Sequence, residues 1–77
     1  MEEVLRDIVA AALEVDRASI GPETSMESVE SWDSLKHLEI VMAIEERFGI
    51  ELEVDDIVEM VDFAGIERTV VKRTSGV

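Results

Sequence analysis

The spacing of apolar residues constrains the fold of this chain more than any other feature. In residues 3–15 the apolar side chains recur at three- and four-residue intervals, which is the spacing of one face of an α-helix. Residues 35–48 form the most apolar stretch of helical length, and no segment alternates convincingly with a period of two. The sequence therefore predicts an all-α protein.

Capping residues and a long loop set the bounds of the two main helices. Asp33 is suited to cap the helix over residues 35–48, and Gly49 is a natural stop at its end. The segment between the two helices, residues 16–33, contains a Gly-Pro pair and several Ser and Thr residues, so it is expected to be a loop. A loop this long in so small a domain is often functional.

The C-terminal part of the chain is expected to form two more helices. A short one begins at about residue 55, and a last one covers residues 63–72 with Asp62 as its cap. Gly65 is expected to weaken that last helix by up to about 1 kcal/mol relative to Ala, and residues 73–77 are expected to fray. We therefore expect residues 1–77 to be a single domain, a small four-helix bundle of three main helices and one short helix.

Composition narrows the possible functions. The chain has no Cys, which excludes disulfides, thiolate nucleophiles and thiolate metal sites. Its net charge of −12 disfavours a nucleic acid or an anionic membrane surface as partner and favours basic protein surfaces. The first residue, Met1, is followed by two Glu residues, which is the wrong charge for a signal peptide, and the chain contains no apolar run of membrane-spanning length. A cytoplasmic monomer without a membrane span is expected.

The helix over residues 35–48 has more apolar surface than a small bundle can bury. One apolar stripe is expected to face the core and consists of Ile40, Val41, Ile44 and Phe48. A second stripe is expected to lie at the surface and consists of Leu35, Leu38 and Met42. The acidic residues beside this second stripe are Asp33, Glu39, Glu45 and Glu46. Such an apolar ridge in an acidic field suits a partner with a basic rim and an apolar centre.

Ser34 begins this helix, directly after the capping Asp33. The unpaired N–H groups and the positive dipole end of a helix N-terminus favour a phosphodiester on a serine oxygen there. Taken alone, the tripeptide Asp-Ser-Leu is a weak motif, and a plain cap followed by a polar residue explains it better. The only histidine, His37, is expected to be exposed or partly packed. No catalytic residue and no metal site are expected.

A longer stretch of sequence is more specific. Residues 32–50, WDSLKHLEIVMAIEERFGI, closely resemble the second helix of acyl carrier proteins, and residues 20–26 resemble the long loop of that family. The resemblance covers residues 4–70 and weakens after residue 52. It implies that Ser34 carries covalent 4′-phosphopantetheine, whose thiol holds an acyl or aminoacyl group as a thioester. It also implies that Asp33 and Leu35, on either side of that serine, are read by the phosphopantetheinyl transferase.

The same resemblance implies a docking surface on this helix. The matching positions for partner enzymes are Leu38, Glu39, Met42, Glu45 and Glu46. Lys36 and Trp32 depart from the pattern of fatty acid synthesis and indicate a carrier of a more specialised pathway. Lys36 inverts a charge at the docking edge. Trp32 is a further candidate contact, and it either lies against the arm or covers the start of the helix.

The expected function is therefore that of a carrier protein, which is not an enzyme. Its pathway is fatty acid, polyketide or other specialised biosynthesis. Its partners are a phosphopantetheinyl transferase, an acyl- or aminoacyl-loading enzyme, and downstream synthases or transferases with basic docking patches. The alternative is an acidic helical adaptor that docks basic partners without covalent cargo. The two differ at Ser34, because the carrier needs its hydroxyl and the adaptor tolerates Ala there.

Overall fold

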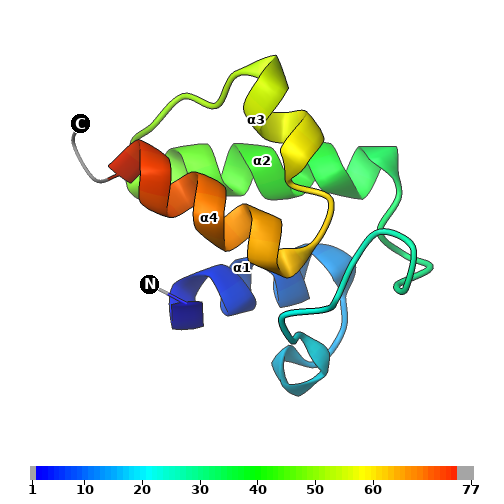
Figure 1. Cartoon of the computed structure of the whole chain (residues 1–77). Helices are drawn as coiled ribbons and strands as arrows, with labels where there is room; N and C mark the ends of the chain where they lie inside the picture. Colours follow the sequence, from blue (N-terminus) through cyan, green and yellow to red (C-terminus); the bar gives the residue numbers. More distant parts are fainter. Residues whose placement is uncertain (1, 75–77) are drawn as a thin grey trace.

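The computed structural model describes residues 2–74, and these residues form four α-helices and one short 3₁₀ helix. The elements in chain order are α1 (Glu2–Leu13), η1 (Arg17–Ser19), α2 (Ser34–Phe48), α3 (Val54–Glu59) and α4 (Phe63–Thr74). Figure 1 shows the three longer helices packed together and the short α3 at one side of them. The predicted all-α bundle with a long connection between its first two helices is confirmed. Within the described residues, no helix is long and apolar enough to cross a membrane.

The first helix ends earlier than its apolar spacing indicates. Glu14 has a φ of 59°, which is a left-handed conformation. The amides of Glu14 and Val15 donate to the carbonyls of Ala11 (3.3 Å) and Ala10 (3.1 Å), and these two bonds close a Schellman turn. Val15 still packs against the core, so its place in the apolar pattern reflects packing after the turn.

The connection between α1 and α2 is held against the connection between α3 and α4. The amide of Met26 donates to the carbonyl of Val61 at 3.0 Å, and the amide of Phe63 donates to the carbonyl of Thr24 at 2.8 Å. The two segments also form an isolated antiparallel β-bridge. The loop that leads to α2 is therefore part of the packed body.

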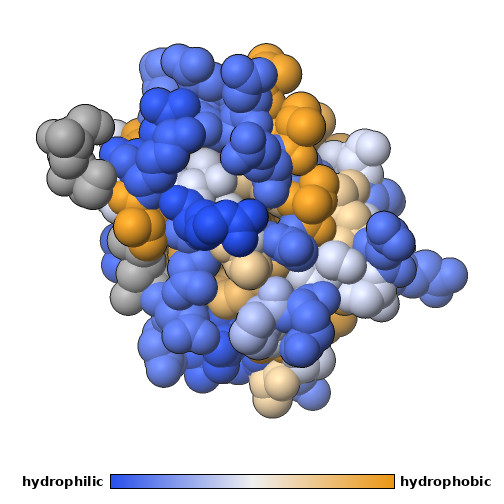
Figure 2. Space-filling model, viewed as in Figure 1, coloured by the Kyte–Doolittle hydropathy of each residue, from blue (hydrophilic) through white to orange (hydrophobic). Residues whose placement is uncertain are grey.

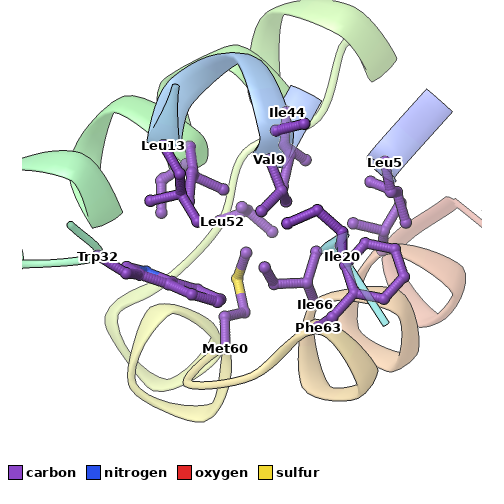
Figure 3. Close-up of a cluster of buried hydrophobic side chains, with 14 residues drawn as sticks. Leu5, Val9, Leu13, Ile20, Trp32, Ile44, Leu52, Met60, Phe63 and Ile66 are labelled. Carbon is purple, nitrogen blue, oxygen red and sulfur yellow. The ribbon is translucent and has the colours of Figure 1, made fainter. Parts of the chain in front are cut away.

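The core draws side chains from α1, α2 and α4 and from the connections between helices (Figure 3). Leu5 and Val9 of α1 and Phe63 and Ile66 of α4 are all at most 1% exposed. The inward stripe predicted for α2 is confirmed at three positions that are at most 4% exposed, namely Ile40, Val41 and Ile44. Phe48, the fourth member, is half-buried and packs against the same cluster.

Gly65 in α4 is required by a close approach of the chain. A Cβ atom at this position would lie 2.5 Å from the carbonyl oxygen of Glu59 and 2.9 Å from Oδ1 of Asp62. The predicted cap is present, because Oδ1 of Asp62 accepts a hydrogen bond of 2.7 Å from the Gly65 amide. The steric clash of a Cβ atom is therefore the dominant effect at this position, and it outweighs helix propensity, which ranks Ala above Gly.

A buried carboxylate joins α3 to the end of α4. Oδ2 of Asp56, a residue only 3% exposed, accepts hydrogen bonds from the Glu53 amide (3.0 Å) and from Nε of Arg73 (2.8 Å). The bond from the Glu53 amide, helped by Arg73, lowers the pKa of the Asp56 carboxyl. α4 continues through Thr74, beyond the predicted end at residue 72 and into the segment expected to fray. The rest of that segment, residues 75–77, lies outside the described residues.

Candidate functional site

The start of α2 is fixed by the cap that the sequence predicts. Asp33 has an extended backbone, and its Oδ1 accepts a hydrogen bond of 2.9 Å from the Lys36 amide. Its own carbonyl accepts a hydrogen bond of 2.9 Å from the His37 amide. These two bonds define Ser34 as the first residue of the helix. At the other end, Gly49 adopts a left-handed conformation with φ 65° and ends the helix.

Ser34 presents an available hydroxyl group at this helix end. The residue is exposed, and no other residue in the range 2–74 makes a hydrogen bond with its Oγ. The first-turn amides of a helix have no partner within the helix and carry the positive end of its dipole. A phosphate esterified to Oγ would therefore lie in solvent beside unpaired N–H groups. The residues present fit a covalently attached phosphopantetheine at this position.

An apolar ridge follows Ser34 along the exposed side of α2. Its members, the predicted outer stripe, are strongly exposed: Leu35 65%, Leu38 53% and Met42 66%. The structure thus confirms which stripe lies at the surface. The acidic residues Glu39 and Glu46 are exposed on the same helix.

α3 and the connection after it add apolar surface that sequence reasoning missed. Val54, Val58 and Val61 are between 48% and 74% exposed. Figure 2 shows hydrophobic residues gathered along one side of the α3 region, next to hydrophilic ones. The signal was in the sequence, because these three residues recur at positions i, i+4 and i+7. We call them the valine patch.

Three charged residues of the predicted docking surface, Lys36, Glu39 and Glu45, make contacts within the protein. The Lys36 ammonium lies 3.2 Å from a Glu14 carboxylate oxygen and 3.8 Å from Glu39. The hydrogen bond to Glu14 raises the pKa of Lys36. Glu45 is half-buried, and its Oε2 accepts a hydrogen bond of 2.9 Å from the Leu52 amide. Lys36 therefore links α2 to the end of α1, and Glu45 holds the segment that follows α2.

Trp32 and His37 are both buried beside the start of α2. They are 2% and 8% exposed, and Nε1 of Trp32 donates a hydrogen bond of 3.0 Å to Nδ1 of His37. The expectation that His37 is exposed or partly packed is therefore wrong. Trp32 is part of the core cluster, which fits the covering role among the two left open for it. Trp32 directly precedes the capping Asp33 and His37 is the fourth residue of α2, so the local geometry of the helix start brings the two rings together.

Comparisons with known proteins agree with this fold. Residues 3–70 match the family described as "Phosphopantetheine attachment site". An acyl carrier protein from Picosynechococcus is 33% identical over 72 residues, which are 94% of this chain and 88% of that protein. The solution structure of the holo acyl carrier protein from Geobacter metallireducens superposes with a TM-score of 0.85. It is 20% identical, and the match covers 96% of this chain and 85% of that one.

The fold, the exposed serine and these matches define a carrier protein rather than an enzyme, with covalently bound 4′-phosphopantetheine as its cofactor. Within that class, the chain belongs to the acyl carrier protein family.

Proposed function

We propose that Ser34 is the attachment residue and that this chain carries an acyl or aminoacyl group as a thioester on the attached arm. The observation that carries the proposal is the exposed Ser34 hydroxyl without a protein partner at the capped start of α2. Ser34 also lies inside the range that matches the phosphopantetheine attachment family. The proposal takes residues 1–77 as one carrier domain.

The residues of this chain have distinct parts in that role. Under the action of a phosphopantetheinyl transferase, Ser34 Oγ attacks the phosphorus of coenzyme A that bears the pantetheine, the pyrophosphate bond breaks, and 3′,5′-ADP leaves. The hydroxyl proton passes to a base of the transferase or to solvent. The bound arm supplies the thiol that holds the cargo. Asp33 fixes the helix start and binds the Lys36 amide, and the first two amides of the helix, those of Ser34 and Leu35, would be available to a phosphate on Oγ. We propose that Asp33 and Leu35 are also read by the transferase.

Partner enzymes dock, in this proposal, on the apolar ridge and the acidic residues beside it. The ridge offers apolar area at the surface, and Glu39 and Glu46 offer charge to basic patches. The valine patch offers further exposed apolar area for a partner. Lys36 and Glu45 act indirectly, since both are held by contacts within the protein. Trp32 contributes by supporting the start of α2 from the core.

The proposed pathway rests on two residues that depart from the pattern of fatty acid synthesis. Trp32 and Lys36 differ from the pattern of fatty acid synthesis, so we propose a specialised pathway with its own loading enzyme and downstream synthases or transferases. The cytoplasm, where coenzyme A is available, is the proposed site of action. The alternative, an acidic adaptor without cargo, shares the same docking surface and differs only at Ser34.

An intact-mass measurement separates these two functions. The protein is incubated with coenzyme A and a broad-specificity phosphopantetheinyl transferase. We expect one added phosphopantetheinyl group on the wild type and on Ser28→Ala, a matched change at an exposed loop serine, and none on Ser34→Ala. Addition to Ser34→Ala would place the attachment elsewhere. No addition to folded wild-type protein with several transferases would favour the adaptor.

A further inference from the structure

The hydrogen bonds of His37 assign its protonation state. Nδ1 accepts from the Trp32 indole N–H at 3.0 Å, and Nε2 lies 3.0 Å from the carbonyl oxygen of Ile57 in α3. An indole nitrogen is only a donor, and a carbonyl oxygen is only an acceptor. Nδ1 must therefore be free of a proton, and Nε2 must carry one. Only the neutral Nε2–H form of His37 makes both bonds.

This pair of bonds ties three segments together at one point. Trp32 lies at the end of the long loop, His37 lies in α2, and Ile57 lies in α3. The Ile57 carbonyl also accepts the Met60 amide at 3.2 Å, so His37 supports the C-terminal end of α3. The two ring centroids are 6.0 Å apart at an angle of 31°.

We propose that Trp32 and His37 form an acid-sensitive latch that holds the loop end in front of Ser34. When Nδ1 gains a proton, two N–H groups point at each other across the 3.0 Å contact, and the bond is lost. Nε2 keeps its bond to Ile57, because it donates in both states. The imidazolium therefore stays with α3, and the indole, which is 2% exposed, separates from it.

The charged groups around the pair do not replace the lost bond. Among residues 2–74, no carboxylate makes a hydrogen bond or an ion pair with the His37 ring. Several charged groups of the neighbouring elements have other partners: Asp33 binds the Lys36 amide, Lys36 pairs with Glu14 in the turn after α1, and Asp56 of α3 pairs with Arg73 of α4. Within residues 2–74, an imidazolium at this position thus gains no ion pair that would compensate for the separation from Trp32.

The latch deepens the function proposed for Ser34. Ser34 lies between the two rings in the sequence, and only Asp33 separates it from Trp32. Movement of Trp32 acts directly on the cap of α2 and hence on the helix start that carries the hydroxyl. The importance of this movement for carrier activity rests on the proposed function. The latch itself is a property of the unmodified chain, so it is tested without any modification of Ser34.

The chain has one Trp, one His and no Tyr. The fluorescence emission therefore reports on Trp32, and the imidazole ¹⁵N shifts report on His37. Unmodified protein is titrated from about pH 8 to about pH 5, the range in which imidazoles change their charge. Imidazole ¹⁵N shifts are expected to show the Nε2–H form at the upper end. As the ring gains its proton, Trp32 emission is expected to shift to longer wavelength. An Nδ1–H ring at the upper end, or ring protonation without an emission change, would overturn the latch.

His37→Gln provides the matched control. Gln keeps a donor and an acceptor in one side chain and does not titrate, while every carboxylate of the protein is retained. We expect the emission of this variant to stay constant over the same pH range. The same transition in His37→Gln as in the wild type would assign it to carboxylates and overturn the proposal. If the variant does not fold, the wild-type ¹⁵N and emission data decide alone. Failure of Ser34 modification leaves all of these readouts unchanged.

Discussion

Replacing Asp56 by Asn tests how much the buried carboxylate contributes to stability. Two charge-assisted bonds change, one from the Glu53 amide and one from the Arg73 guanidinium. A hydrogen bond to a charged group contributes about 1.5–3 kcal/mol, and Asn keeps one neutral oxygen for the Glu53 amide. Because the Arg73 side chain is 32% exposed, water solvates it in the variant, and the ion pair contributes less than about 1 kcal/mol.

The sum of these effects is a loss of about 2 kcal/mol in the free energy of unfolding. For a domain of this size that corresponds to a decrease in Tm of roughly 8–16 °C. The measurement is urea unfolding followed by circular dichroism. Asp55→Asn is the matched control, because it removes the same charge from an exposed position on the same helix. Equal effects of the two substitutions, or a more stable Asp56→Asn, would refute the reasoning.

The pH dependence gives the same prediction a second test. The folded-state pKa of Asp56 is lowered, chiefly by the Glu53 amide. The stability it contributes is therefore fully present above the unfolded-state pKa of Asp, about 3.9, and is lost as the pH falls through the lower folded-state pKa. The difference between wild type and Asp56→Asn is expected to be constant near neutrality and to shrink in acid. A difference that stays constant into strong acid would contradict the ionised form as its source.

Three further predictions concern packing and docking. Gly65→Ala is expected to lower the free energy of unfolding by about 1–3 kcal/mol through overpacking, and with it the urea midpoint, because the added Cβ would lie 2.5 Å from a backbone oxygen; a raised midpoint would disprove the close approach. Leu38→Asp is expected to weaken binding of a partner enzyme, measured by calorimetry, and to change unfolding free energy by less than about 0.5 kcal/mol. Val71→Asp, a similarly exposed position on α4, should leave binding intact, and equal losses of binding and stability in Leu38→Asp would mean that the ridge is misassigned. Raising ionic strength from about 0.01 M to about 0.15 M is expected to weaken the same binding through screening, and insensitivity to salt would remove the electrostatic part of the docking proposal.

Local sequence signals predicted the helices well, because each helix has its own periodicity and cap. Asp33, Gly49 and Asp62 all occupy the cap positions expected of them. The end of α1 was placed too late, because Val15 keeps the apolar spacing after the chain has turned at Glu14. The periodicity reports which residues are buried, and it does not register where the backbone hydrogen bonds stop.

The less predictable features depend on contacts between distant segments. Burial of His37 requires the loop end and α3 to meet at α2, and Gly65 is constrained by a carbonyl of the preceding helix. The valine patch was missed because an apolar stripe on a short helix reads equally well as core. For Ser34, the sequence predicted the exposed helix start, while its role in attachment remains a proposal tested by mass.

The short helix α3 is held at both ends by contacts with other helices, and these contacts determine how easily it opens. The helix has six residues, fewer than the roughly 12–15 that an isolated helix needs in water. Asp56 holds its first turn to α4, and the Ile57 carbonyl holds its last turn to α2, while Val54 and Val58 face solvent. Its amide protons are therefore protected from exchange by neighbouring helices rather than by the helix itself. α3 behaves as a dependent unit, whose exchange rates report on the contacts between α2, α3 and α4.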